Sequence, residues 1–411
     1  MQDGRSIERF DFYLFCLLCA LLGMSLLIIF GATSSSGVMR SKAYTQLAAV
    51  VIGIALVIMM QLVDYRTILD NAYTVYWSCV GLLLGVLVFG LVAKGSKSWF
   101  VVPVIGFRFQ PSELMKVGLI IGLARCLSKR DRSLDGLKEM LIPLILIGIP
   151  FLLVLAQHDA GTALVFPLVA MAMFWAAGVR KIYLFLLLSP ALGIMGIRGG
   201  FVSLFIFAVL LFILFRIAIK VGVPWLDWCI FLAVNVVSYF AAPMAWEFLK
   251  PHQRQRLMVF LEPNVDPMGI SWNLIQSKVA LGSGGFWGKG WQQGTQIRGQ
   301  FLPAFHTDFA FSVLGEEWGF VGCLILMVIF FLFLIHGLEI AQSTRYLPGA
   351  LVVVGVVALF FIHILVNVGM CMGLMPIIGI PLCFISYGGS ALVANALAAS
   401  FLFNVQIHRF K

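Results

Sequence analysis

Long apolar runs separated by short polar segments dominate the chain. Runs of about 17 to 25 apolar residues have the length of a membrane-spanning helix. We read twelve of them, near residues 12–31, 45–63, 72–93, 111–127, 139–156, 162–178, 181–197, 200–218, 224–244, 307–336, 349–375 and 386–407. The pattern predicts an all-α polytopic membrane protein of about 10–12 transmembrane helices.

Composition and charge agree with a membrane protein. The chain is 61% hydrophobic and 11% charged, whereas soluble domains carry about 25% charged residues. The net charge of +10 would suggest nucleic acid as a partner of a soluble protein. In a membrane protein, Lys and Arg instead accumulate in cytoplasmic loops, so we expect membrane lipids and no nucleic acid as partners.

The distribution of basic residues predicts the orientation of the spans. The densest short basic segment carries Arg125, Lys129, Arg130, Arg132 and Lys138, so it is expected on the cytoplasmic side. Counting spans outward from it places both termini in the cytoplasm. The same count predicts one large extracytoplasmic loop, residues 245–306, within a single domain that covers residues 1–411.

The interval 251–309 is too polar to be a plain spanning helix, and it contains a glycine-rich run, GSGGFWGKG (282–290). That run lacks the GxGxxG spacing, and Gly290 follows Lys289 where a phosphate-binding P-loop needs Ser or Thr. We therefore interpret it as a scaffold of tight turns. Cys16 and Cys19 have CxxC spacing without a second Cys or His pair, so no zinc site is expected.

Two clusters of ionisable residues lie at the ends of apolar runs. Glu113 and Lys116 are three residues apart, so they can pair on one helix face, and Pro111 suits a first helical turn. The pair is either a capping arrangement or a functional one, because charges inside a membrane tend to mark polar sites. Asp159 precedes another run and is expected to cap it, with a catalytic role as the alternative.

A third cluster combines cations with a carboxylate. Arg254 and Arg256 precede Asp266, which is held in extended or turn geometry by Pro267. The residues are equally compatible with a structural Asp-Pro turn and with a carboxylate near arginines that bind phosphate.

An ordered series of motifs resembles the SEDS family (shape, elongation, division, sporulation). It comprises QPSELMK (110–116), DAGTAL (159–164), QRQR (253–256), DPMG (266–269), NLIQSKVALGSGGFWGKGW (273–291), QGTQ (293–296), FLP (301–303), HTDF (306–309) and GIPLCFISYGGS (379–390). The GKGW and QGTQ motifs resemble the elongation branch, RodA, rather than the division branch, FtsW. The resemblance covers most of the chain.

The resemblance implies a peptidoglycan glycosyltransferase of the bacterial cytoplasmic (inner) membrane. Such enzymes polymerise lipid II into glycan strands beside a class B penicillin-binding transpeptidase. It implies a catalytic role for Asp266 and places Glu113 and Lys116 along the family's cavity. The chain departs from the family in two places. Residues 198–244 suggest an extra helical hairpin, and Ala304 stands where the family commonly has Glu.

Transfer from an α-linked lipid diphosphate to a β-1,4 glycan inverts the sugar's configuration. We expect Asp266 to act as general base. Cations would stabilise the departing diphosphate. The candidate substrate-binding residues are Arg254, Arg256, Glu113, Lys116 and Lys278, and the supporting candidates are Asp159, His306 and Asp308. A divalent cation (Mg or Mn) could assist, although no metal site is recognisable. The alternatives are a lipid II flippase and a noncatalytic scaffold of the elongation complex.

Overall fold

The computed structural model describes residues 10–33, 37–93, 96–102, 107–129, 136–195, 200–248, 251–261, 270–299, 301 and 305–409. Its long helices are α2 (Phe12–Thr33), α3 (Gly37–Met59), α5 (Ala72–Phe89), α6 (Pro111–Leu127), α7 (Leu137–Ala156), α8 (Ala160–Ala176), α9 (Lys181–Met195), α10 (Gly200–Val221), α11 (Trp225–Phe248), α15 (Ala310–Ser343), α16 (Leu347–Met372) and α17 (Gly389–His408). Each predicted apolar run therefore forms a helix. Within these residues, seven helices are long and apolar enough to cross a membrane, so this is an integral membrane protein.

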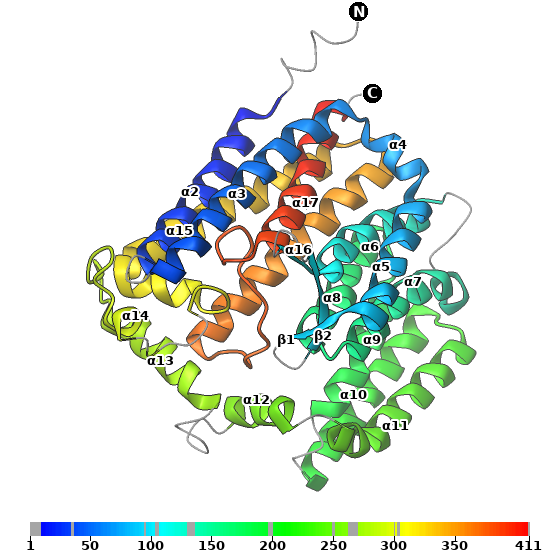
Figure 1. The fold of residues 1–411 in the computed structure, drawn as a ribbon. Helices are drawn as coiled ribbons and strands as arrows, with labels where there is room; N and C mark the ends of the chain where they lie inside the picture. Colours follow the sequence, from blue (N-terminus) through cyan, green and yellow to red (C-terminus); the bar gives the residue numbers. More distant parts are fainter. Residues whose placement is uncertain are drawn as a thin grey trace, which may run out of the picture.

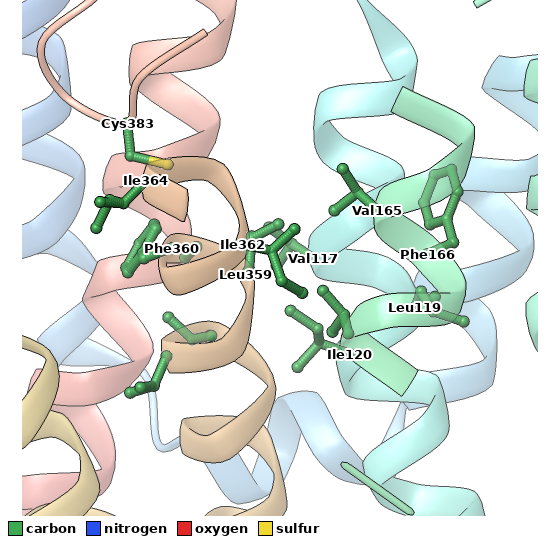
Figure 2. Packing of buried hydrophobic residues seen from close by; sticks show 14 of the residues in the cluster. Val117, Leu119, Ile120, Val165, Phe166, Leu359, Phe360, Ile362, Ile364 and Cys383 are labelled. Atoms are coloured by element: carbon green, nitrogen blue, oxygen red, sulfur yellow. The ribbon is translucent and has the colours of Figure 1, made fainter. Parts of the chain in front are cut away.

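The start of α2 and the end of α17 lie at one end of the helical bundle, and α12 to α14 lie toward the other end (Figure 1). A short linker, η1 (Met60–Leu62) and α4 (Tyr65–Asp70), joins α3 to α5. α16 and α17 form the interior of the bundle, because 78% of the apolar window of each is buried, against 28% for α15. Apolar side chains of α6, including Val117 and Ile120, face Leu359 and Ile362 of α16 (Figure 2).

The predicted span 72–93 is wrong at its C-terminal end, and no strand was predicted there. α5 ends at Phe89, and the chain then forms an antiparallel sheet of β1 (Leu91–Ala93), β2 (Ser96–Val102) and β3 (Phe107–Phe109) in the order β1-β2-β3. Ladder pairs such as Val101 with Arg108 satisfy backbone groups that a helix would satisfy within itself. The Lys97 N–H also donates to the Gln157 carbonyl at the end of α7 (3.1 Å). The sheet is thereby tied to the helices that carry the site.

The polar interval is partly helical, with α12 (Pro251–Leu261), α13 (Ile270–Ser283) and α14 (Thr295–Arg298). The glycine-rich run between α13 and α14 bonds to a kink in α15 through its backbone. Lys289 and Gly290 donate to the carbonyls of Glu316 and Glu317, both at 3.0 Å.

Two glycines permit this close approach. Gly288 (φ 82°) and Gly319 (φ 64°) both have left-handed conformations, which glycine adopts without steric cost. A Cβ on Gly288 would lie 2.2 Å from the Glu317 carbonyl oxygen. The run therefore has the scaffold role that its sequence predicts.

Helices α10 and α11 occupy the range of the expected extra hairpin. Asp227, at the start of α11, accepts a hydrogen bond from the Tyr183 hydroxyl of α9 (2.6 Å) and one from the Leu137 N–H of α7 (3.2 Å). This buried carboxylate fixes α11 against both neighbouring helices.

Candidate active site

The first turn of α6 holds a buried ion pair. Pro111 occupies the first turn of this helix, where its missing N–H costs nothing. Lys116 Nζ lies 2.9 Å from Glu113 Oε1 and 2.8 Å from Oε2. The side chains are only 3% and 4% exposed. The predicted three-residue pairing is therefore present. Moving both charges out of water costs free energy that their mutual attraction need not repay. A gain in stability is therefore a poor explanation of the pair.

A histidine from a distant helix completes this cluster. His363 lies on α16 and is 1% exposed. Its Nε2 is 3.2 Å from Lys116 Nζ, and its Nδ1 is 3.1 Å from the Pro381 carbonyl oxygen. His363 is not among the site residues predicted from the sequence. The available signal was an ionisable residue inside a long apolar run.

The beginnings of α6 and α8 are joined by side chains. Asp159 caps α8, because its Oδ1 accepts from the Thr162 N–H (3.1 Å) and its Oδ2 from the Thr162 hydroxyl (2.9 Å). Gln110, which precedes α6, donates to Asp159 Oδ2 at 3.0 Å. The structure therefore shows the predicted capping role, and it shows that Asp159 also fixes α8 to the start of the ion-pair helix.

The turn between α16 and α17, residues 373–388, brings the second group of predicted site residues together. Arg256 Nη1 donates to the Ile378 carbonyl at 3.5 Å. A Cβ on Gly379 would lie 3.5 Å from Asp308 Oδ2 and 3.7 Å from Arg256 Nη1. Arg256 and Asp308 thus flank the same point of this turn.

Packing and hydrogen bonds hold the turn itself in place. Gly161, in the first turn of α8, packs so closely on it that a Cβ would lie 2.7 Å from the Ile378 carbonyl oxygen. Asn367 of α16 donates to the Asp308 carbonyl at 2.9 Å and to the Ile380 carbonyl at 2.8 Å. The capped start of α8, the turn and the Arg256 region are therefore contiguous.

The other predicted cations point elsewhere. Arg254 donates to the Glu247 carbonyl of α11. Two residues apart on one helix, Arg254 and Arg256 do not share a face. The exposed Lys278 side chain lies beside Gly373 at the C-terminal end of α16, where a cation suits the helix dipole. Among the described contacts, Lys278 thus meets the first residue of the turn, and of these three cations only Arg256 lies near Asp308.

His306 connects the polar interval to a different helix. Its Nε2 lies 3.2 Å from Lys42 Nζ of α3, and its ring packs edge-on against Tyr387. The His306 carbonyl accepts from the Tyr387 N–H at 2.8 Å. Lys42 is a further cation near the turn that the sequence analysis did not single out, and its short polar segment between two apolar runs was the available signal.

Asp266, the predicted general base, lies outside the described residues, as does Pro267. In the chain it falls between the end of α12, which carries Arg256, and the start of α13. Among the described residues no three His, Cys, Asp or Glu side chains are grouped as metal ligands would be. A role for a divalent cation stays a prediction.

Comparison with known proteins assigns the chain to a family. The cell cycle protein family of FtsW, RodA and SpoVE matches residues 11–204 and 201–411. The chain belongs to this family, which is the SEDS family that its motifs resemble.

Relatives and solved structures cover nearly the whole chain. The peptidoglycan glycosyltransferase MrdB of Escherichia coli K12 is 35% identical over 96% of this chain and 92% of its own length. The peptidoglycan glycosyltransferase RodA of Treponema pallidum is 34% identical over 98% of both chains. A chain from a peptidoglycan synthase complex that coordinates polymerization and crosslinking superposes with a TM-score of 0.72 at 27% identity, covering 98% of this chain and 99% of its own. The crystal structure of Thermus thermophilus RodA shares the fold, with a TM-score of 0.65 at 24% identity over 98% of each chain.

Proposed function

We propose that this protein is a RodA-type peptidoglycan glycosyltransferase that polymerises lipid II into glycan strands. The near full-length similarity to MrdB and RodA supports this assignment. The observation that carries the site is the buried Lys116–Glu113 pair, next to the joined helix starts of α6 and α8 and the turn that meets Arg256. An apolar bundle with such a cluster suits a substrate that has a lipid tail and a charged diphosphate.

In this proposal the protein lies in the bacterial cytoplasmic membrane with both termini in the cytoplasm. The basic segment that includes Arg125 and Lys129 supports this orientation. So does the location of the start of α2 and the end of α17 at one end of the bundle, away from α12 and α13 (Figure 1). The site side chains would then serve the outer leaflet, where a wall polymer must be made.

The proposed reaction is a single inverting displacement. Asp266 removes the proton from the acceptor sugar's hydroxyl, and the resulting oxygen attacks the anomeric carbon of the donor. The bond from that carbon to the diphosphate oxygen breaks, and undecaprenyl diphosphate leaves with the electron pair. Arg256 and Lys116 stabilise the negative charge that develops on the leaving group. Arg254, by its bond to the Glu247 carbonyl, positions α12 in this scheme.

A class B penicillin-binding transpeptidase is the proposed partner. The chain superposes over 98% of its length on a component of a peptidoglycan synthase complex that joins polymerization to crosslinking. A polymerase whose strands are crosslinked as they emerge benefits from a transpeptidase held beside it. Co-purification with the cognate transpeptidase, and stimulation of glycan synthesis by it, are the expected results.

Polymerisation of lipid II by the purified protein with its transpeptidase partner tests the function. Wild type should make glycan strands, and Asp266→Asn should reduce the rate by about 100-fold or more, the range of general-base catalysis. Asp70→Asn is the matched control, because Asp70 is 66% exposed and pairs with Arg125.

The outcomes separate the hypotheses. Near wild-type synthesis by Asp266→Asn would refute the general base and leave the polymerase standing. Absence of synthesis by wild type, combined with translocation of labelled lipid II across vesicles, would instead favour the flippase.

A further inference from the structure

The position of His363 defines its hydrogen-bonding state. A carbonyl oxygen only accepts hydrogen bonds and a lysine ammonium only donates them. The Nδ1 atom, 3.1 Å from the Pro381 carbonyl oxygen, must therefore carry the hydrogen. The Nε2 atom, 3.2 Å from Lys116 Nζ, must present its lone pair. A single neutral tautomer satisfies both contacts, and an imidazolium would point an N–H at the ammonium.

His363 is a second acceptor group for Lys116, beside Glu113. One carboxylate, Glu113, occupies one side of the ammonium, and the histidine ring occupies another. The three groups come from two helices, with Glu113 and Lys116 on α6 and His363 on α16. The ammonium is thereby held from two directions, and its orientation depends on α16 as well as on its own helix.

The same ring reaches the turn that carries the second half of the candidate site. Pro381, its acceptor, lies two residues from Gly379, beside which Arg256 and Asp308 both lie. The neighbouring carbonyl of Ile380 accepts from Asn367 of α16 at 2.8 Å. His363 is therefore the one side chain among the described contacts that bonds both to Lys116 and to the backbone of this turn.

We propose that His363 is a positioning residue, which orients the Lys116 ammonium toward the diphosphate of the lipid-linked sugar and keeps it in register with the turn near Arg256. This inference rests on the proposed function. It assigns no bond-making step to the histidine. A residue with this role raises the turnover rate through Lys116, and it has little influence on the affinity for the lipid tail.

A pair of substitutions separates positioning from packing. Gln at position 363 can donate from its amide nitrogen and accept at its amide oxygen, whereas Phe fills the space of the ring and does neither. Polymerisation of lipid II is measured against lipid II concentration for His363→Gln and His363→Phe, together with thermal unfolding in detergent. His336→Gln is the matched control, because His336 lies on α15 and pairs with Asp11.

We expect kcat of His363→Phe to fall about tenfold or more while KM changes less than about threefold, because positioning of a leaving-group cation acts in the transition state. His363→Gln should retain at least about a third of the wild-type rate, and His336→Gln should match wild type. If the His363→Phe protein cannot be purified in a folded state, His363→Asn is used instead. The asparagine side chain is too short to reach both Pro381 and Lys116.

A double variant provides the decisive readout. In a Lys116→Gln background, His363→Phe should have no further effect on the residual rate, because its influence passes through Lys116. The inference is overturned if His363→Phe, or the Asn variant in its place, keeps wild-type kcat. It is also overturned if the loss is the same factor with and without Lys116, or if Gln and Phe lose activity in step with their melting temperatures. An inactive wild type would instead remove the proposed function, and this inference with it.

Discussion

Two lysine–glutamate pairs in this protein, each with a buried carboxylate, have similar geometry and different surroundings. Lys116–Glu113 and Lys289–Glu316 have closest N–O distances of 2.8 and 2.7 Å. Glu316 is fully buried, and its Oε1 also accepts from the Thr295 N–H (2.8 Å), the Thr295 hydroxyl (2.9 Å) and the Gln296 N–H (3.1 Å). Glu316 therefore accepts several hydrogen bonds from the polar interval, residues 251–309, and this pair holds residues 289–296 against α15.

The Lys116–Glu113 pair of α6 is incompletely satisfied. Among the described residues, Glu113 has Lys116 as its one charged neighbour, and its Oε2 receives no well-directed hydrogen bond. Lys116 is balanced on its other side by a neutral histidine, His363. Buried pairs of this kind contribute little to stability. The difference lies in the hydrogen bonds that the carboxylate accepts beyond the ion pair. A carboxylate with many such bonds has a structural role, whereas one with few is available as part of a functional site.

The largest effect is expected when one charge is removed from the Lys116–Glu113 pair. Lys116→Met leaves Glu113 buried without a counter-ion, so we expect a loss of about 3–5 kcal/mol in the free energy of unfolding together with a fall of at least about 100-fold in the rate of glycan synthesis. Chemical denaturation in detergent and lipid II polymerisation measure the two. An active, fully stable Lys116→Met variant would show that the pair is neither buried nor used as described.

Removal of the saturated carboxylate should act mainly on structure. Glu316→Ala removes the counter-ion of Lys289 and leaves the Thr295 N–H and the Gln296 N–H without their acceptor, at a cost of about 1–3 kcal/mol. Limited proteolysis should then cut within residues 284–299 faster than in wild type. An unchanged rate of proteolysis would show that Glu316 does not hold this segment against α15. Glu339→Ala is the control, because this glutamate is exposed and remote from the polar interval.

The glycine scaffold that carries Lys289 is tested by a smaller change. Gly288→Ala combines a left-handed backbone conformation with a Cβ 2.2 Å from the Glu317 carbonyl, so we expect a loss of about 1–3 kcal/mol in the free energy of unfolding. Gly282→Ala is the matched control, because a Cβ there meets nothing within 4 Å and Ala favours its helix by up to about 1 kcal/mol. Equal stability of the two variants would refute the close approach.

The smallest expected effect distinguishes two arginines of one helix. Arg256→Ala should lower the polymerisation rate about tenfold, equivalent to about 1.4 kcal/mol, because it removes a cation beside Asp308. Arg254→Ala should lower it less than about threefold, because Arg254 bonds to the Glu247 carbonyl instead. The reverse order would mean that the other face of α12 meets the diphosphate.

The helices were predictable because each long apolar run has one solution in a membrane, a helix that satisfies its own backbone. The Glu113–Lys116 pair and the Asp159 cap were also predictable, since both depend on residues three apart on one helix. The sheet of residues 91–109 was not, because its apolar first strand continues the hydrophobic run of α5. His363 was not predictable as a partner of Lys116, because that contact joins residues 247 positions apart.

The most direct test compares the two pairs after both charges of each are removed. The double variants Glu113→Gln/Lys116→Met and Glu316→Gln/Lys289→Met are assayed side by side for thermal unfolding and for lipid II polymerisation. We predict that the first unfolds within about 1 kcal/mol of wild type yet polymerises at least about 100-fold more slowly. The second should lose stability and activity together. Near wild-type polymerisation by Glu113→Gln/Lys116→Met would contradict the account.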